Sequence, residues 1–468
     1  MKIEQIYTGC LAEAAYYIES KGEVAIIDPL RETSPYILKA EKDKAAIKYI
    51  FETHFHADFV SGHVELAQKT GAKIVYGPKA ECGFDCYSAT DGEEFKVGDL
   101  TINTLHTPGH TPESTTWLLL DEKGKEHCIF TGDTLFIGDV GRPDLAIKSS
   151  LTKEDLAGML YDSLHNKILT LPDDVIVYPA HGAGSACGKN MSKETFDTLG
   201  HQRNVNYALQ PVTKERFIKE VTADLLPPPQ YFSKNALLNK QGAGSLDKVY
   251  DGGMKKLLPG EFEAIAEASG ALVLDTRDPQ IFVPAFIPGS INIGLNGQFA
   301  PWVGALITDL GQPILIVCDA GKEEETIKRL ARVGYDNTLG YLDGSIEAWR
   351  NSGREVDSIQ SISAIEFENE YRSNTIHVLD VRRPGEYEKE HVVNAENKPL
   401  DFINDWTSEL TNDKTYYIHC AGGYRSMITT SILKSRGFEN LVEVAGGYGA
   451  IAKTNIPKTD LIIETKQE

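Results

Sequence analysis

The amino-acid sequence predicts an α/β protein of three domains, and three observations carry this prediction. The chain has 468 residues, which is enough for about three domains at roughly 150 residues each. Residues 1–200 alternate short β-branched segments with helical patterns, as layered α/β folds do. Residues 255–468 contain an internal repeat of about 100 residues, which predicts two small α/β domains in tandem.

The strands expected in the first domain are short apolar runs, and several end in residues that can carry chemistry. They read AAYYI, VAIID, AIKYIFETH, KIVYG, LTINTLHTP, TTWLLL, HCIFTGD and VIVYPAH. Functional side chains commonly lie on the loops that follow such strands, so the site of this domain is expected there.

The repeat is visible segment by segment. LVLDTRDPQIF at 272–282 matches HVLDVRRPGEY at 377–387, and ILIVCDAG at 314–321 matches YYIHCAGG at 416–423. Each unit reads strand, helix, strand, loop, helix, strand, and this order predicts a parallel sheet.

The first domain boundary is expected near residue 250. A helical segment, NVNYALQPVTKERFIKEVTADLL, leads into PPPQYF and then KQGAGS, and such proline and glycine/serine stretches are typical of connections. We predict a first domain with a C-terminal linker at 1–250, a second domain at 251–357 and a third at 358–468.

Composition and charge exclude several classes of function. Hydrophobic residues make up 41% and charged residues 25% of the chain, which is ordinary for globular proteins. The net charge of -21 argues against nucleic acid and anionic membranes as partners. The start MKIEQIYTGC shows no signal peptide, and no apolar run is long enough for a transmembrane helix. The seven scattered cysteines form no disulfide framework, so a reducing cytoplasm is expected.

A metal centre is expected at the strand ends of the first domain. ETHFHADF places His54, His56 and Asp58 two residues apart directly after an apolar strand. Three later strand ends carry His110, Asp133 and His181. A lone histidine is more often structural, but four strand ends with histidine or aspartate in one domain predict a metal centre.

These motifs resemble the metallo-β-lactamase superfamily over about residues 1–210, and the resemblance implies an αββα sandwich. The superfamily motif THxHxDH reads THFHADF here, so Phe59 replaces the last histidine. In dinuclear hydrolases of the superfamily that histidine binds the second metal, which a phenyl ring cannot do. The departure disfavours a two-metal hydrolase, although Asp58, Asp133 and His181 would still allow a weakened second site.

The remaining ligands are two histidines and a carboxylate, His54, His110 and Asp133, a set that suits non-haem Fe(II). GDTLFIGDVGRPDL at 132–145 and HGAGSACG resemble the persulfide dioxygenase branch, which is related to glyoxalase II. The resemblance implies one Fe(II) per chain on these three residues. It also implies that three further groups orient the ligands and hold water or substrate, namely His56, Asp58 and His181.

The reaction that this resemblance implies is oxidation of a low-molecular-weight thiol persulfide by O2 to sulfite and the thiol. Arg142 in the GRPDL segment is a candidate contact for the anionic substrate, and an ion pair with Asp144 or another neighbour is the alternative. Cys187 lies six residues after His181, near the expected metal site, but a small buried residue is its commoner role.

The other cysteines of the first domain are given no functional role. Cys10 and the pair Cys82 and Cys86 are expected to be small buried residues. A zinc site on the pair would need two more ligands, and the neighbouring sequence offers none.

A sulfur-transfer site is expected at CAGGYRS, residues 420–426, which lies between the strand TYYIH and a helical pattern. Backbone N–H groups and the helix dipole at this position favour a thiolate on Cys420. Gly422 and Gly423 let the loop curl, and Arg425 adds positive charge. A lone cysteine is usually structural, but this context predicts a catalytic one.

The loop resembles the rhodanese active-site loop, within a resemblance that covers about residues 358–455. It implies that Cys420 carries sulfane sulfur with Arg425 as a second catalytic residue. The groups implied to bind the sulfur substrate are Gly422, Gly423 and Ser426. Asp380 and Arg382 match the family's D-x-R segment and are expected to be structural.

The first repeat departs from this pattern. Its loop reads CDAGKEEE at 318–325, one residue shorter, with three glutamates after Cys318. Negative charge raises a thiol pKa and repels a persulfide, so the 251–357 domain is expected to be inactive and to serve packing or positioning.

The sequence thus favours a persulfide dioxygenase joined to a thiosulfate sulfurtransferase. Its partners would be small persulfides, O2 and sulfite, and its role would be sulfide detoxification. A homo-oligomer is compatible with the sequence. Two alternatives stay open. One is a glyoxalase II-like zinc thioester hydrolase with an attached sulfurtransferase. The other is a sulfur-carrier protein that uses the metal domain as a scaffold.

Overall fold

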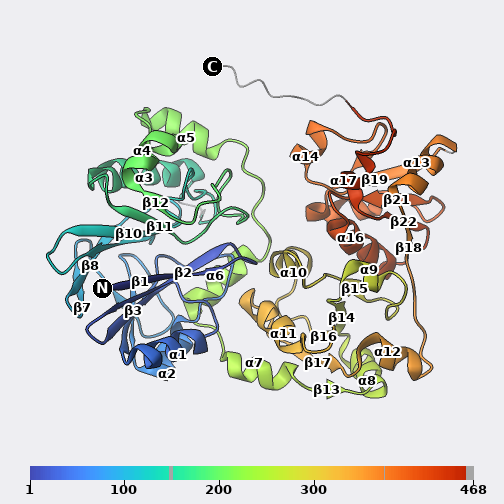
Figure 1. Cartoon of the computed structure of the whole chain (residues 1–468), viewed down its shortest axis with the longest axis horizontal. Helices are drawn as coiled ribbons and strands as arrows, with labels where there is room; N and C mark the ends of the chain where they lie inside the picture. The colour runs from blue at the N-terminus through green and yellow to red at the C-terminus, as the bar shows by residue number, and fades with distance from the viewer. Residues whose placement is uncertain (147–150, 374, 460–468) are drawn as a thin grey trace. The chain divides into compact units, whose positions relative to one another are not determined.

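A computed structural model describes residues 1–146, 151–373 and 375–459, and these residues form two compact units. The first unit holds Met1–Lys248 with Leu330–Gly334, and the second holds Val249–Arg329 and the residues from Tyr335 on. Figure 1 shows the chain coloured from its N-terminus to its C-terminus. No helix among the described residues has both the length and the apolar character that a bilayer crossing requires.

The first unit is built on two six-stranded sheets. The first sheet has the order β1 (Lys2–Thr8), β2 (Glu13–Ser20), β3 (Glu23–Ile27), β4 (Ala46–Phe51), β5 (Lys73–Tyr76) and β6 (Tyr87–Ser88). The second has the order β12 (Asp197–Thr198), β11 (Ile176–Pro179), β10 (Glu126–Gly132), β9 (Thr115–Leu120), β8 (Leu100–His106) and β7 (Glu94–Val97). Every predicted strand is present, and β1, β6, β7 and β12 were not predicted.

Alternation along the strands explains why the two sheets pack face to face. Tyr16 points into a core between the sheets, with Phe51, Trp117 and Phe130, while its neighbour Tyr17 points to the opposite face. The outer face of the first sheet is covered by α1 (Ser34–Asp43) and α2 (His63–Thr70). The second sheet is covered by α3 (Lys153–Asn166), α4 (Leu199–Val205) and α5 (Lys214–Thr222). These layers confirm the αββα sandwich.

The segment after residue 200 differs from the prediction in two ways. The single expected helix is divided between α4 and α5, because Pro211 interrupts it and Thr213 caps the second helix by accepting a hydrogen bond from Arg216 N. The expected linker contains two helices, α6 (Phe232–Gln241) and α7 (Leu246–Gly253). Helix α6 belongs to the first unit, where Asn239 donates hydrogen bonds to the His56 and Phe59 carbonyls, each at 2.7 Å.

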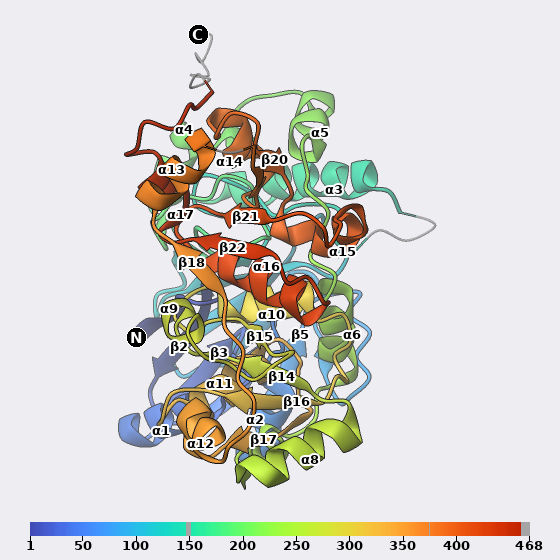
Figure 2. The ribbon, with the colours of Figure 1, turned by 90° about the vertical axis from the view of Figure 1, so that its right-hand side faces the viewer.

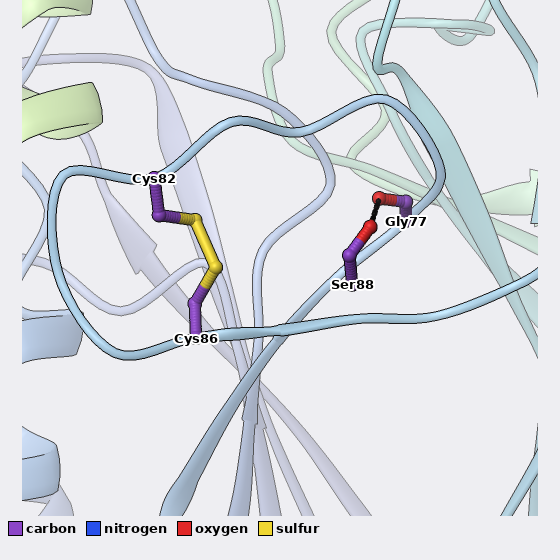
Figure 3. The surroundings of a disulfide bond; sticks show 4 residues. All are labelled: Gly77, Cys82, Cys86 and Ser88. Atoms are coloured by element: carbon purple, nitrogen blue, oxygen red, sulfur yellow. Dashed lines mark hydrogen bonds between the residues drawn. A yellow bond between two sulfur atoms is a disulfide. The ribbon is translucent and has the colours of Figure 1, made fainter.

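A disulfide joins Cys82 and Cys86 in the loop between β5 and β6, as Figure 3 shows. The expectation that these two cysteines are unlinked buried residues is therefore wrong. The loop brings their Cα atoms to 6.4 Å, within the range that a disulfide spans, and both side chains are only half-buried. A backbone hydrogen bond from Gly83 to Lys240 ties this loop to α6.

The second unit contains two five-stranded parallel sheets with the same strand order, as the internal repeat predicts. The first has β13 (Lys256–Leu257), β17 (Thr338–Leu342), β16 (Ile314–Val317), β14 (Leu272–Asp275) and β15 (Ile291–Asn292). The second has β18 (Gln360–Ile362), β22 (Leu441–Val444), β21 (Tyr416–His419), β19 (His377–Asp380) and β20 (Glu396–Asn397).

Short helices accompany both sheets of the second unit. The first repeat has α8 (Pro259–Ser269), α9 (Pro279–Phe282), α10 (Phe299–Leu306), α11 (Glu323–Arg332) and α12 (Ser345–Asn351). The second has α13 (Ala364–Ser373), α14 (Pro384–Lys389), α15 (Ile403–Trp406), α16 (Tyr424–Ser435) and α17 (Gly447–Ile451). Asp380 and Arg382 form a buried ion pair at 2.6 Å, and Asp275 and Arg277 repeat it at 2.5 Å. Both parts of the expected α/β architecture are thus confirmed.

Candidate metal centre and sulfur-transfer site

The six predicted metal-site residues meet at one edge of the sandwich because each follows the end of a strand. The loop after β4 supplies His54, His56 and Asp58, and the segments after β8, β10 and β11 supply His110, Asp133 and His181. All six side chains are buried. They divide into two groups of three, His54, His110 and Asp133 in one and His56, Asp58 and His181 in the other, and the ligand atoms within each group lie within 4.8 Å of one another.

In the first group, two imidazoles face one carboxylate oxygen. His110 Nε2 lies 3.5 Å and His54 Nε2 3.8 Å from Asp133 Oδ2, and this oxygen is buried without a hydrogen-bond partner. Gly141 lets the following segment pass close by, since a Cβ there would lie 2.0 Å from the Asp133 carbonyl oxygen. Two imidazole nitrogens that converge on a buried carboxylate oxygen without a hydrogen-bond partner fit a metal ion.

The outward ring nitrogens set the tautomers of the two histidines. His110 Nδ1 lies 2.9 Å from the Arg142 carbonyl oxygen, which can only accept, so Nδ1 carries the proton. His54 Nδ1 lies 2.9 Å from Thr53 Oγ1, whose own hydroxyl donates to Asp28. Burial lowers the pKa of His54 well below its ordinary value. Both rings therefore present a free Nε2 lone pair toward Asp133.

The second group is tied together by His181. Its Nδ1 lies 2.6 Å from Asp133 Oδ1, and its Nε2 lies 2.8 Å from Asp58 Oδ2. Burial opposes the charged ring, but the two carboxylates outweigh burial and raise the pKa of His181 well above its ordinary value. The ring thus joins the two groups and orients Asp133.

Phe59 occupies the position where the superfamily motif has its last histidine. Its side chain is fully buried, with its ring centroid 4.4 Å from that of His56 and 6.4 Å from that of His181. Phe59 therefore places a ring that cannot bind a metal beside His56 and His181.

Asp28 and Glu52 belong to this region and were not predicted. His56 Nε2 lies 3.1 Å from Asp28 Oδ1 and 3.7 Å from Glu52 Oε2. Burial acts to lower the pKa of His56, but these carboxylates outweigh burial and raise it. The signal was available in the sequence, since Asp28 ends the run VAIID and Glu52 precedes Thr53 after AIKYIF.

Arg142 contacts the site through its backbone, while its guanidinium pairs with Asp144. The Nε–Oδ1 and Nη2–Oδ2 distances are 2.6 and 2.8 Å, and Nη1 and Nη2 also donate to the Ala186 and Leu226 carbonyls. The ion pair that was the alternative to substrate contact is thus the observed arrangement, and the Arg142 carbonyl orients His110.

Cys187 was expected to be a small buried residue, and it lies directly beside the predicted metal residues. Its side chain is buried, and its sulfur lies within 4.8 Å of ligand atoms of Asp133 and His181. Burial, reinforced by Asp133 and Asp58, raises the pKa of the Cys187 thiol well above its ordinary value. The spacing of six residues from His181 was the sequence signal for this position.

Cys420 lies just after β21 and just before α16, as predicted, with its side chain buried. Gly423 N–H donates to Cys420 Sγ at 3.1 Å, and Ser426 Oγ lies 3.6 Å from the same sulfur. Gly423 has a φ of 103°, which favours glycine, whereas Gly422 has no positive φ and no close neighbour. One backbone donor therefore faces the sulfur at the start of the helix. The Ser426 hydroxyl adjoins the sulfur but has closer acceptors in the Gly423 carbonyl and Glu443, at 3.0 and 3.1 Å.

Arg425 lies beside this loop and is paired. Its Nη1 and Nη2 donate to Glu386 at 2.6 and 2.7 Å. Burial acts to lower the pKa of the Arg425 guanidinium, but the hydrogen bonds and the charge of Glu386 outweigh burial and raise it. Arg425 thus supplies positive charge near the sulfur while Glu386 holds it in place.

Cys318 occupies the corresponding place in the first repeat, directly after β16, and is buried. Burial, with Glu323 as the next cause, raises the pKa of its thiol to about 12. Of the three glutamates, Glu323 therefore acts on Cys318 in the direction that the sequence predicts.

This pKa leads to a labelling prediction. A thiol with a pKa raised to about 12 is a thiolate in only about one molecule in 10⁴ at pH 8, and alkylation requires the thiolate. We expect iodoacetamide at pH 8 to leave Cys318 unlabelled in the native chain and to label it after unfolding, as measured by peptide mass spectrometry. Half-buried Cys10 is the control, and labelling of Cys318 at the rate of Cys10 would contradict the prediction.

Comparisons with known proteins agree with this arrangement. The family model "Metallo-beta-lactamase superfamily" matches residues 8–85 and 87–181, and "Rhodanese-like domain" matches 258–352 and 363–454. The mitochondrial persulfide dioxygenase ETHE1 of Homo sapiens is 32% identical over 210 residues, which are 44% of this chain and 74% of the relative.

Two further similarities extend the comparison. The cytoplasmic hydroxyacylglutathione hydrolase of Arabidopsis thaliana is 32% identical over 186 residues, covering 39% of this chain and 67% of the relative. A crystal structure of a metallo-beta-lactamase from Staphylococcus aureus matches 73% of this chain and 98% of its own, with a TM-score of 0.63 and 30% identity. The chain belongs to the metallo-β-lactamase superfamily, with persulfide dioxygenases among its homologues, and continues into two tandem rhodanese-like domains.

Proposed function

We propose that the chain oxidises a low-molecular-weight thiol persulfide with O2 to sulfite and thiol, at one iron ion held by His54, His110 and Asp133. The observation that carries the proposal is the convergence of two free histidine Nε2 atoms on a buried carboxylate oxygen without a partner. The similarity to ETHE1 supports the choice of reaction. Iron, when bound, would supply the redox chemistry that joins oxygen to the persulfide sulfur.

The residues around the three ligands keep them in place for this reaction. The Arg142 carbonyl and Thr53 Oγ1 hold the two imidazoles with Nε2 directed inward. His181 holds Asp133 through Oδ1, so that Oδ2 remains available. Such supporting contacts typically change metal affinity or activity by about 10- to 100-fold when removed.

We further propose that Cys420 carries a sulfane sulfur and gives it to sulfite. Sulfite attacks the outer sulfur of the Cys420 persulfide, the S–S bond breaks, thiosulfate forms and Cys420 leaves as a thiolate. The hydrogen bond from Gly423 N–H stabilises negative charge on that sulfur, and Arg425 attracts the anionic acceptor. The two activities together would convert persulfides to thiosulfate.

Oxygen consumption by the iron-loaded chain tests the first part of the proposal. Protein purified without oxygen, loaded with Fe(II) and given glutathione persulfide should consume O2 and release sulfite or thiosulfate. Removal of the metal with a chelator should stop the uptake, and renewed Fe(II) should restore it. Absence of uptake with glutathione persulfide, coenzyme A persulfide and cysteine persulfide would refute the dioxygenase proposal.

A thioester hydrolase is the second candidate, because the ligand atoms of His56, Asp58 and His181 also lie within 4.8 Å of one another. The similarity to hydroxyacylglutathione hydrolases supports this candidate too. Phe59 disfavours it, since the buried ring adjoins these residues where a further ligand would be needed.

The substitution Phe59→His tests this role. We expect the native chain loaded with zinc to retain about one ion and Phe59→His to retain about two, because the new imidazole completes a second site. Phe55→His is the matched control, since Phe55 lies in the same motif but packs against Tyr76. Metal analysis after gel filtration gives the stoichiometry. Two zinc ions in the native chain, with S-lactoylglutathione hydrolysis, would favour the hydrolase.

A further inference from the structure

The helix that follows Cys420 packs on the first rhodanese-like repeat. Met427 on α16 is buried with Phe282 and Phe286 of the first repeat, and one helical turn later Ser431 Oγ accepts a hydrogen bond from Asn292 N at 2.9 Å. Figures 1 and 2 both place α16 beside β15 and α9. The face of α16 that begins at its first residue, Tyr424, is therefore an interface between the two repeats.

Tyr424 enters a notch formed by two glycines of the first repeat. Its hydroxyl donates to the Gly294 carbonyl oxygen at 2.7 Å, and its side chain is largely buried. A Cβ on Gly297 would lie 2.7 Å from Tyr424 Cε2 and Cζ, and one on Gly294 would lie 3.4 Å from Cε2. Neither glycine has a positive φ. At Gly297 the space taken by the ring therefore calls for glycine, whereas Gly294 contributes the carbonyl that binds the hydroxyl.

The notch is one peptide bond away from the group that contacts the sulfur. Gly423, whose N–H donates to Cys420 Sγ, directly precedes Tyr424 and has a left-handed backbone. On the other side, Tyr448 N–H donates to the Cys420 carbonyl. The loop is thus held by its own domain at Cys420 and by the first repeat at Tyr424.

We propose that the first repeat is a positioning domain for sulfur transfer, in which the Gly294/Gly297 notch fixes Tyr424 and thereby directs Gly423 N–H at Cys420. The proposal rests on the sulfur-carrying role proposed for Cys420. It assigns a role to a repeat whose own cysteine, Cys318, is buried and protonated. Tyr424 acts through the loop and does not itself contact the sulfur.

Substitution of Gly297 by alanine tests the proposal, because the added methyl group must displace the Tyr424 ring. We expect kcat for sulfur transfer from thiosulfate to cyanide to fall roughly tenfold in the full chain, with little change in KM, as for a small misplacement of a reacting group. Alkylation of Cys420 by iodoacetamide should change by a similar factor. Gly311→Ala is the matched control, since a Cβ there makes only ordinary contacts in the same repeat.

A milder variant covers the case in which Gly297→Ala does not fold. Tyr424→Phe keeps the ring and removes only the hydrogen bond to Gly294, so a fall in kcat with an unchanged melting temperature supports positioning. If both variants match Gly311→Ala in kcat and in Cys420 alkylation, the proposal is refuted. If the native chain transfers no sulfur, the proposed role of Cys420 fails, and the alkylation rates still decide whether the notch shapes the loop.

Discussion

Iron binding and O2 consumption are expected to be lost together when His110 is replaced by alanine. The substitution removes one of the three proposed iron ligands and leaves only two of them, His54 and Asp133. Because even supporting contacts change metal affinity by about 10- to 100-fold, loss of a direct ligand should lower O2 uptake with glutathione persulfide by more than about 100-fold. Iron content and an oxygen electrode measure the two effects.

Sulfur transfer from thiosulfate should persist in the same variant, because Cys420 lies in a different domain and the donor to its sulfur is the Gly423 backbone N–H. The matched control is His201→Ala, which removes an exposed histidine of the same domain that pairs with Asp197. Undiminished O2 uptake in His110→Ala with full iron content would contradict the assignment of the ligands. Loss of sulfur transfer in the same variant would instead indicate a folding defect.

The second large effect is expected at Cys420. Cys420→Ser should abolish transfer from thiosulfate to cyanide, at least about 1,000-fold, because a hydroxyl forms no persulfide and no other group replaces the nucleophile. O2 consumption should continue. The product of persulfide oxidation should change from thiosulfate to sulfite, since the cysteine that carries sulfane sulfur to sulfite is lost. Chromatography of the anions measures this ratio.

Cys318→Ser is the matched control for this experiment, because Cys318 holds the same place in the first repeat and its pKa is raised to about 12 by burial and Glu323. It should leave both sulfur transfer and the product ratio unchanged. Continued thiosulfate formation by Cys420→Ser would show that thiosulfate arises without the second repeat. An equal loss in both variants would contradict the inactivity of the first repeat.

Much of the architecture could be predicted because it depends on local patterns. Strands such as AIKYIF and VIVYP are short apolar runs ended by polar residues, and period-two alternation places Tyr16 and Tyr17 on opposite faces whatever the surroundings. The repeat predicted two sheets of one strand order because similar segments in the same order form the same parallel units. The segment after residue 200 was predicted less well. Its single expected helix is divided by local features, Pro211 and the Thr213 cap, whereas α6 lies in the expected linker, and its Asn239 binds the distant His56 and Phe59 carbonyls.

The sequence by itself determined which residues could bind a metal and which cysteine follows a strand with a glycine-rich loop, because these depend on residue type and strand position. Only the tertiary structure decided how those groups are used. It paired Arg142 with Asp144, joined Cys82 to Cys86, brought Cys187 beside Asp133 and set Tyr424 against Gly297. Cys187 and Tyr424 meet their neighbours only because segments far apart in sequence come into contact. The partners of Arg142 and Cys82 are two and four residues away, and there the path of the loop, which residue type alone does not fix, brings the groups together.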